Sequence, residues 1–368
     1  MTPSPRRSPI LSWTVLVPLV AVIVLALAWG RTLPTVVVVV VTAVLAGAVL
    51  AAVHHAEVVA HRVGEPFGSL VLAVAVTVIE VALIVTLMVA GAGAAETLAR
   101  DTVFAAVILT CNGIVGLSIL VAARRESVVS FNAEGAGAAL ATVATLTTLG
   151  LVLPTFTTSR PGPVFSPAQL AFAAVTALVV YGLFVFLQTG RHRSYFLPMS
   201  GGGHVVNDAD ARAIQPSKGA AVASLGLLIL ALVDVVGNAK LVSPAIERVV
   251  TAAGLPVSVV GVVIAILILL PETFAALRAA RRGQLQTSLN LAFGSAMASI
   301  GLTIPTIAVA SIWLSVPLHL GLGATHIVLF VLTCIVAVLT VVPGRATLLQ
   351  ACVHLAVLAA YLFLAVSP

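Results

Sequence analysis

Three acidic side chains lie inside strongly apolar stretches of the sequence, namely Glu80, Asp234 and Glu272. An ionised carboxylate inside a bilayer costs at least about 2.5 kcal/mol on insertion scales, so such residues usually face a cavity and act there. No Lys or Arg occurs between Arg62 and Arg100, so Glu80 has no basic partner in its own stretch. Its carboxyl group must hold either a proton or a cation, unless its protonated form is bonded to a neighbouring helix. A site that can hold a proton or a cation, but not both at once, predicts proton-coupled cation exchange.

Glu272 occupies the matching position in the second half of the chain and directly follows Pro271. Proline lacks a backbone N–H, so we expect it to break the helix and leave carbonyl oxygens free beside the carboxylate. Carboxylate and carbonyl oxygens are the ligands that hard cations such as calcium prefer. The alternative is an ion pair between Glu272 and Arg278 or Arg281, near the cytoplasmic end of the stretch.

Asp234 has a less specific environment than the two glutamates. It lies within about one turn of Asn238 and Lys240, at the outer end of its apolar stretch. Acidic residues at such positions usually pair with a nearby basic group. We therefore expect Asp234 to form an ion pair at a helix end.

Each glutamate-bearing stretch is followed by one with small and polar residues. The first contains Asn112, with Gly116 one turn later, and the second contains Asn290. The second also has hydroxyl groups that share one helical face, on Ser288, Ser295, Ser299 and Thr303. Small residues allow close helix approach, and amide and hydroxyl oxygens can add neutral ligands. The candidate ion site therefore consists of Glu80 and Glu272, supported by Asn112, Asn290, Ser295, Ser299 and Thr77.

Two further clusters are less specific. Three histidines beside Glu57 predict a solvated loop, with a zinc site as the alternative; they are His54, His55 and His61. A weak regulatory cation site is one interpretation of a cluster in the longest polar segment, made of His204, Asp208 and Asp210. The sequence contains no GxxxxGK[ST], HExxH or GxSxG motif, so neither an ATP-driven pump nor an intramembrane hydrolase is indicated. We expect no cofactor and no enzymatic activity.

The composition is that of a membrane protein. Of the 368 residues, 61% are hydrophobic and 8% are charged, whereas a soluble chain averages about 25% charged residues. The mean hydropathy of +1.21 excludes a soluble globular domain. The apolar blocks are about 20 residues long, which matches the roughly 30 Å hydrocarbon core at 1.5 Å per helical residue. The sequence predicts an all-α polytopic protein of the lipid bilayer. Its net charge of +6 reflects basic loops and indicates no nucleic-acid binding.

About eleven transmembrane helices follow from these blocks, near residues 10–29, 33–53, 67–92, 102–122, 136–154, 167–188, 219–236, 255–277, 287–313, 322–342 and 347–366. Thirteen of the 18 Lys and Arg residues lie on the side of the N-terminus. The other five are Arg31, Arg100, Arg160, Lys240 and Arg248. The positive-inside rule therefore predicts a cytoplasmic N-terminus and, with an odd number of spans, a C-terminus outside. We expect the protein in the cytoplasmic (inner) membrane.

The polar segment at 189–218 divides the chain. We interpret it as a cytoplasmic linker between a first five-helix repeat at 33–188 and a second at 219–368, with an N-terminal segment and one extra helix at 1–32. Two homologous halves with five spans each must sit in the membrane in opposite orientations. This arrangement is typical of inverted-repeat transporters.

Two long blocks of sequence surround the glutamates. The first includes GEPFG at 64–68, VTVIEV at 76–81, RDTVF at 100–104 and NGIVG at 112–116. The second includes PET at 271–273, QLQTSLN at 284–290, GSA at 294–296 and GLTIP at 301–305. These blocks resemble the two α-repeats of the calcium/cation antiporter superfamily, and specifically its bacterial ChaA-type calcium/proton antiporters.

The resemblance implies a fold of one extra N-terminal helix plus two inverted five-helix repeats. It also implies one central acidic residue in each repeat, at Glu80 and Glu272, with Asn112 and the Ser295 and Ser299 region beside them. The expected function is exchange of calcium for protons by alternating access. Two glutamates have a formal charge of −2, which matches one divalent ion or two protons. A sodium or potassium/proton antiporter on the same scaffold is the alternative, and a cation channel is a weaker one.

Overall fold

The computed structural model describes residues 12–31, 33–64, 67–89, 96–197, 216–256, 258–313 and 318–368. Within these ranges the chain is almost entirely helical, which confirms the predicted all-α class. Nine of the helices in these ranges are long and apolar enough to cross a membrane, and two shorter apolar helical stretches, Trp13–Ala28 and Val74–Val89, bring the number to eleven. The chain is therefore a polytopic membrane protein. The predicted cluster of His204, Asp208 and Asp210 lies outside the described residues.

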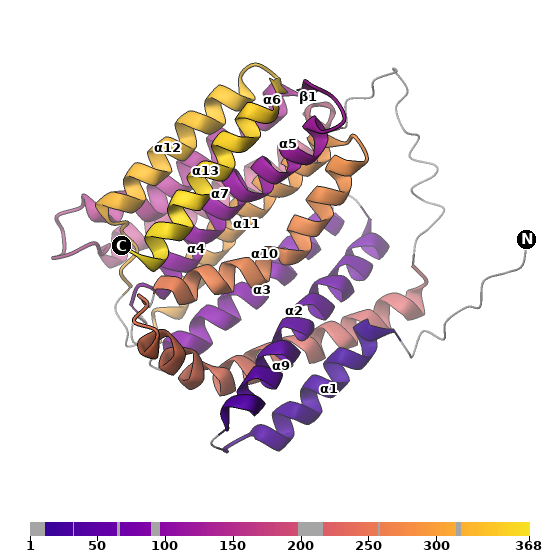
Figure 1. Cartoon of the computed structure of the whole chain (residues 1–368), viewed down its shortest axis with the longest axis vertical. Helices are drawn as coiled ribbons and strands as arrows, with labels where there is room; N and C mark the ends of the chain where they lie inside the picture. Colours follow the sequence, from indigo (N-terminus) through magenta and orange to yellow (C-terminus); the bar gives the residue numbers. More distant parts are fainter. Residues whose placement is uncertain are drawn as a thin grey trace, which may run out of the picture. The chain divides into compact units, whose positions relative to one another are not determined.

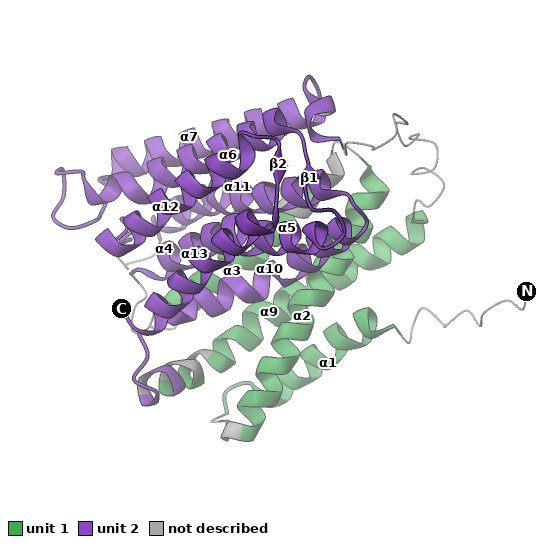
Figure 2. Ribbon diagram, turned by 45° about the horizontal axis from the view of Figure 1, so that its top comes forward, with its two compact units in different colours: residues 1–90, 207–248 green, residues 91–206, 249–368 purple. Residues whose placement is uncertain are grey.

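The helices group into two compact units, which have different colours in Figure 2. Unit 1 consists of α1 (Trp13–Ala28), α2 (Thr35–Val63), α3 (Phe67–Val89) and the part of α9 (Lys218–Ala252) up to Arg248. In this unit α2 packs against both α1 and α3. His55 of α2 also joins α1 to α9, because its Nε2 lies 2.9 Å from the carbonyl oxygen of Thr14 and its Nδ1 lies 3.3 Å from Ser224 Oγ.

Unit 2 contains the other helices (Figure 1). In chain order they are α4 (Leu98–Ile108), the π-helix η2 (Leu109–Ile114), α5 (Val115–Ala123), α6 (Ala133–Thr147), the π-helix η3 (Thr148–Val152), the 3₁₀ turn η4 (Leu153–Thr155), α7 (Pro167–Thr189), the 3₁₀ turn η5 (Arg193–Phe196), α10 (Ser258–Arg281), α11 (Leu285–Ala310), α12 (Ala324–Val341) and α13 (Leu348–Val366). A short antiparallel pair, β1 (Val129–Ser130) and β2 (Arg345–Ala346), joins two helix connections, with Val129 opposite Ala346.

The core of unit 2 is built around α4 and α11. Ten residues of α4 are buried, and α11 packs against α4, α6, α7 and α10. Close approach between these helices depends on glycine. A Cβ at Gly301 of α11 would lie 2.7 Å from Cβ of Tyr181 in α7, and one at Gly261 of α10 would lie 3.0 Å from the backbone of Asp101 in α4. Such separations leave no room for a larger residue at either position.

Two helices extend well beyond the predicted spans. The helix α2 continues to Val63, so the prediction of a solvated loop at His54, His55 and His61 is wrong. His55 is 2% exposed because both ring nitrogens have partners on other helices. The helix α9 continues through Pro244 to Ala252. In α2 the buried His55 binds neighbouring helices, and in α9 the buried Asn238 binds the backbone of its own helix. Hydropathy along a single segment reveals neither contact.

The two units do not follow the predicted segments 1–32, 33–188, 189–218 and 219–368. Unit 1 combines α1, α2 and α3 with α9, which belongs to the second predicted repeat. A compact unit is defined by packing, whereas a repeat is defined by homology between segments. The repeat organisation therefore stays a prediction.

Candidate functional site

Glu80 lies on the buried face of α3 in unit 1. Its side chain is 3% exposed, and Thr77, one turn earlier on the same face, is 6% exposed. The helix forms because the surrounding stretch is continuously apolar, with no charged residue other than Glu80 between Phe67 and Val89. A carboxyl group and a hydroxyl three residues apart on a helix can contact the same ligand. The geometry of α3 therefore allows Thr77 to support an ion held by Glu80.

Glu272 lies in α10 of unit 2, where it is half-buried. The expected break at Pro271 does not occur, because α10 runs without interruption from Ser258 to Arg281. Proline still has no N–H to donate to the carbonyl of Leu267, so that oxygen lacks its usual helical partner. Thr273 donates from its hydroxyl to the carbonyl of Leu269 at 2.7 Å. Close to Glu272, one backbone carbonyl thus lacks its helical N–H partner because of Pro271, and another accepts an additional hydrogen bond from Thr273.

Asn112 lies in the π-helical turn η2, between α4 and α5, and is fully buried. Its Nδ2 donates to Thr333 Oγ1 of α12 at 2.9 Å, and its Oδ1 lies 3.2 Å from Nδ1 of His354 in α13. Nε2 of His354 lies 3.1 Å from Thr340 Oγ1. Single π-helical turns inside α-helices occur frequently at functional sites. Here the turn directs the Asn112 amide into a hydrogen-bond network that joins three helices.

Sequence reasoning missed the rest of this network, in which Thr333 and His354 bind Asn112 directly and Thr340 binds His354. Thr333, Thr340 and His354 lie in strongly apolar spans. In such spans a single polar residue is easily overlooked, because it hardly changes the mean hydropathy. The signal was His354, a histidine inside the apolar block at 347–366. A buried imidazole needs hydrogen-bond partners, so its presence there predicts a polar neighbour on another helix.

The polar residues of α11 divide into two groups. At its start, Asn290 donates to the carbonyl of Phe196 at 2.6 Å and accepts from Gln286 Nε2 at 2.9 Å, so both ends of its amide bind within the protein. Ser288 donates to Ser118 Oγ of α5 at 2.6 Å. Further along the helix, Ser299 is buried and Ser295 is half-buried. The start of α11 is therefore held by polar contacts to neighbouring segments, whereas Ser295 and Ser299 lie in its middle.

The predicted site residues lie in both units. Glu80 and Thr77 belong to unit 1, and Glu272, Asn112, Asn290, Ser295 and Ser299 belong to unit 2. Within unit 2, the helices α10, α11 and η2, which contain Glu272, Ser295, Ser299 and Asn112, pack against one another. Across the part of the chain that the structure describes, no three His, Cys, Asp or Glu side chains are grouped as ligands for one metal ion. A cation bound near Glu272 in unit 2 would therefore require neutral oxygen ligands as well.

Comparison with known proteins gives the family. The model of the family described as sodium/calcium exchanger protein matches residues 33–190 and 223–367. The chain belongs to this family. The match also confirms the resemblance to the calcium/cation antiporter superfamily that the two sequence blocks indicate.

This sodium/calcium exchanger family member has relatives that align with nearly its whole length. It is 42% identical over 369 residues to the protein y4hA of Sinorhizobium fredii (strain NBRC 101917 / NGR234), covering 99% of this chain and 98% of y4hA. It is 34% identical to the sodium-potassium/proton antiporter ChaA of Escherichia coli (strain K12), covering 94% of this chain and 93% of ChaA. Both relatives therefore align with this chain over more than nine-tenths of its length.

Solved structures agree with this assignment at the level of the fold. The structure of native YfkE has a TM-score of 0.69 with this family member at 16% identity, covering 96% of this chain and 97% of YfkE. The H⁺/Ca²⁺ exchanger CAX has a TM-score of 0.64 at 16% identity, covering 96% of this chain and 91% of CAX. The helical arrangement is thus shared with both proteins.

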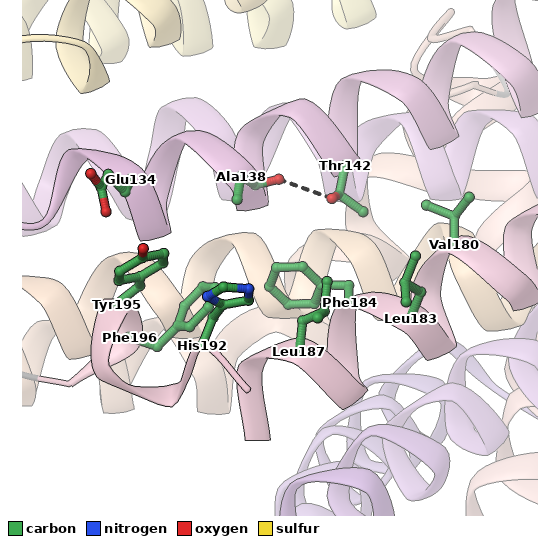
Figure 3. A pocket seen from close by; sticks show the side chains of 10 residues that line it. All are labelled: Glu134, Ala138, Thr142, Val180, Leu183, Phe184, Leu187, His192, Tyr195 and Phe196. Atoms are coloured by element: carbon green, nitrogen blue, oxygen red, sulfur yellow. Dashed lines mark hydrogen bonds between the residues drawn. The ribbon is translucent and has the colours of Figure 1, made fainter. Parts of the chain in front are cut away.

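A cavity of about 230 Å³ lies elsewhere in this exchanger-family chain, between α6, α7 and η5 of unit 2 (Figure 3). Its lining is mostly apolar, with Glu134, His192 and Tyr195 at one end, where the rings of His192 and Tyr195 stack with centroids 5.2 Å apart. None of the predicted ion-site residues lines it. This cavity is therefore separate from the residues expected to hold the ion.

Proposed function

We propose that this chain is a secondary active antiporter that exchanges a cation for protons across the cytoplasmic membrane, with Glu80 and Glu272 as the groups that hold both. The observation that carries the proposal is Glu80, a carboxyl group 3% exposed in an otherwise uncharged transmembrane helix. Charged side chains at such depth are expensive and usually mark an ion pathway. Membership of the sodium/calcium exchanger family supports the same conclusion.

Competition for the carboxylate oxygens would couple the two fluxes. A cation binds the ionised form of Glu80 and Glu272, and protons bind when the cation leaves. Simultaneous occupancy is disfavoured because both ligands need the same lone pairs. Thr77, Asn112, Asn290, Ser295 and Ser299 are the neutral groups that we expect to add oxygen ligands or to position the helices around them.

Calcium is the cation that the charge of the site favours. Two ionised glutamates provide a formal charge of −2, which balances one divalent ion or two protons. Calcium binds 6–8 oxygen ligands in flexible geometry, so hydroxyl, amide and carbonyl oxygens can complete its coordination. Pro271 contributes by leaving a backbone carbonyl near Glu272 without its helical partner.

Sodium or potassium is the second candidate. The observation that favours it is the 34% identity to a relative named as a sodium-potassium/proton antiporter, over 94% of this chain. Either monovalent ion could use the same two carboxylates, with a different number of protons exchanged. Calcium and the monovalent ions are distinguished by measuring which of them drives proton movement across the membrane.

Alternating access would come from two inverted five-helix repeats that move around the ion site. The family model supports this organisation, because it matches two segments, 33–190 and 223–367, that nearly coincide with the predicted repeats. The N-terminus would be cytoplasmic and the C-terminus outside, as the distribution of basic residues indicates.

The decisive experiment is a proton-flux assay in inverted membrane vesicles with an acidic interior and a quenched pH dye. Calcium, sodium and potassium salts are added in turn, with choline chloride as the control for ionic strength. Dequenching by calcium that is lost in both Glu80→Gln and Glu272→Gln would support the calcium/proton antiporter. Dequenching by sodium or potassium alone would support the second candidate. No response to any ion, from protein shown to be folded and inserted, would contradict the proposal.

A further inference from the structure

Asp234 is not part of an ion pair at a helix end, so that prediction is wrong. It lies on the buried face of α9 in unit 1, and both Asp234 and Asn238 are 0% exposed. Neither carboxylate oxygen of Asp234 has a hydrogen-bond partner among the described residues, and neither has the side-chain oxygen of Asn238. Three buried oxygen atoms on one turn of helix are thus left without a donor. Buried polar atoms are nearly always paired, so a group of three needs an explanation.

The nearby basic residues do not provide one. Nζ of Lys240 lies 5.5 Å from the centroid of the Trp29 ring, in a cation–π contact on the exposed side of α9. Arg248 is exposed and donates from Nε to the carbonyl of Pro244 at 3.2 Å. The charge of an ionised Asp234 is therefore not balanced by either of these side chains.

The two side chains are held in place by the local structure. Asp234 and Asn238 are four residues apart, so they lie one above the other on the same face of α9. Nδ2 of Asn238 donates to the backbone carbonyl of Asp234 at 2.9 Å, which fixes the amide and leaves Oδ1 on its opposite edge. Beside them, a Cβ at Gly237 would lie 2.5 Å from Cδ2 of Leu25. The helix α1 therefore packs closely against α9 at this turn.

The buried residues that flank the pair on its own helix are apolar. Ala231, Val235, Ala239 and Val242 of α9 are each at most 3% exposed. An ionised carboxylate in such surroundings needs a positive charge beside it or must take up a proton. A proton on Asp234 could be donated in a hydrogen bond to Oδ1 of Asn238, which would still leave one carboxyl oxygen without a donor. A metal cation can accept lone pairs from several oxygens at once, which accounts for all three.

We propose that Asp234 and Asn238 form a binding site for one monovalent metal cation, sodium or potassium, within unit 1. One carboxylate gives a charge of −1, so a monovalent ion leaves the buried site neutral, whereas calcium would leave an excess positive charge in apolar surroundings. Carboxylate and amide oxygens are hard ligands suited to alkali cations, and neither side chain is soft enough to select a transition metal. The site does not depend on the proposed function of Glu80 and Glu272.

The test is thermal unfolding of the purified full-length chain in detergent. The background variant contains Glu80→Gln and Glu272→Gln, which removes the carboxylates of the proposed transport site. Sodium or potassium chloride is compared with choline chloride at constant ionic strength. A bound cation stabilises only the folded state, so we expect the unfolding temperature to rise by at least about 2 °C at saturating salt. Adding Asp234→Asn should abolish the rise, whereas adding Glu126→Gln, which removes an exposed carboxylate, should leave it unchanged.

A second variant keeps the proposal falsifiable if Asp234→Asn does not fold. Asn238→Ala removes one neutral ligand and keeps the charge, so the salt concentration for half-maximal stabilisation should rise about tenfold. The proposal is overturned if sodium and potassium act no differently from choline, if the rise persists in Asp234→Asn, or if Asn238→Ala leaves the half-maximal concentration unchanged. The proposal is also overturned if Asp234 makes the unfolding temperature depend on pH but not on sodium or potassium, because the carboxyl group then binds a proton and no metal cation.

Discussion

Oδ1 of Asn112 lies 3.2 Å from Nδ1 of His354, a residue 242 positions later in the chain. The direction of this hydrogen bond follows from its neighbours. Thr333 uses its hydroxyl hydrogen on the carbonyl of Leu329 at 2.8 Å, so it must accept from Nδ2 of Asn112. Oδ1 of Asn112 is then an acceptor and Nδ1 of His354 a donor, and the other ring nitrogen, Nε2, contacts Thr340 Oγ1 at 3.1 Å. The Asn112 end of the network therefore has one consistent direction.

We predict that His354→Ala destabilises the protein more than Thr340→Val does. Loss of the imidazole leaves Oδ1 of Asn112 buried without a donor and creates a cavity in unit 2, for a loss in free energy of unfolding of about 3 kcal/mol. Thr340→Val removes a single hydroxyl and should cost about 1 kcal/mol. Equilibrium unfolding in detergent measures both values. Equal effects of the two substitutions would mean that the Asn112 contact contributes nothing.

The sequence predicts the number of spans well because hydrophobic length is a local property. The eleven apolar blocks correspond to the eleven helical segments, and the end of the block at 167–188 differs from that of α7 by one residue. The ends of α2 and α9 could not be predicted in the same way. His55 and Asn238 look like loop residues in a hydropathy profile, yet both are buried. His55 binds other helices through both ring nitrogens, and Asn238 donates to the backbone of its own helix.

The candidate site is harder to predict than the spans. Glu80 is identified by its isolation in an apolar stretch, and its burial agrees with that expectation. Asn290 shows the limit, because its amide binds Phe196 and Gln286, contacts that depend on how the segment after α7 meets α11. Pro271 shows another limit. A proline removes one hydrogen bond, but the surrounding packing keeps α10 continuous.

Thr77→Val should reduce transport without unfolding the protein. The substitution keeps the shape of a buried side chain on α3 and removes the one hydroxyl that shares a face with Glu80 one turn away. If Thr77 contributes an oxygen to the ion, the cation concentration for half-maximal transport should rise about tenfold, since a lost hydrogen bond or ligand to a charged group is worth about 1.5 kcal/mol. Initial rates of dye dequenching in vesicles measure this concentration. Ser118→Ala is the matched control, because its hydroxyl binds Ser288 in unit 2.

The apparent affinity for the cation should fall as the pH falls. Protons and the cation compete for the carboxylates of Glu80 and Glu272, and only the ionised form binds a metal. Below the pH at which the carboxyl groups become protonated, the half-maximal cation concentration should rise by up to about tenfold per pH unit for each proton displaced. Titration of the cation at several pH values gives the slope. A half-maximal concentration that is independent of pH in the unmodified protein would rule out shared ligands.

Gly301→Ala should destabilise unit 2, whereas Gly294→Ala in the same helix should not. A Cβ at position 301 would lie 2.7 Å from Cβ and 2.9 Å from Cγ of Tyr181, so α7 and α11 must move apart or the ring must shift. Overpacking of this kind costs about 1–3 kcal/mol. At position 294 nothing lies within 4 Å of the added carbon, and alanine favours the helix by about 1 kcal/mol. The two free energies of unfolding should therefore change in opposite directions. A neutral Gly301→Ala would show that α7 and α11 do not pack as closely as these separations require.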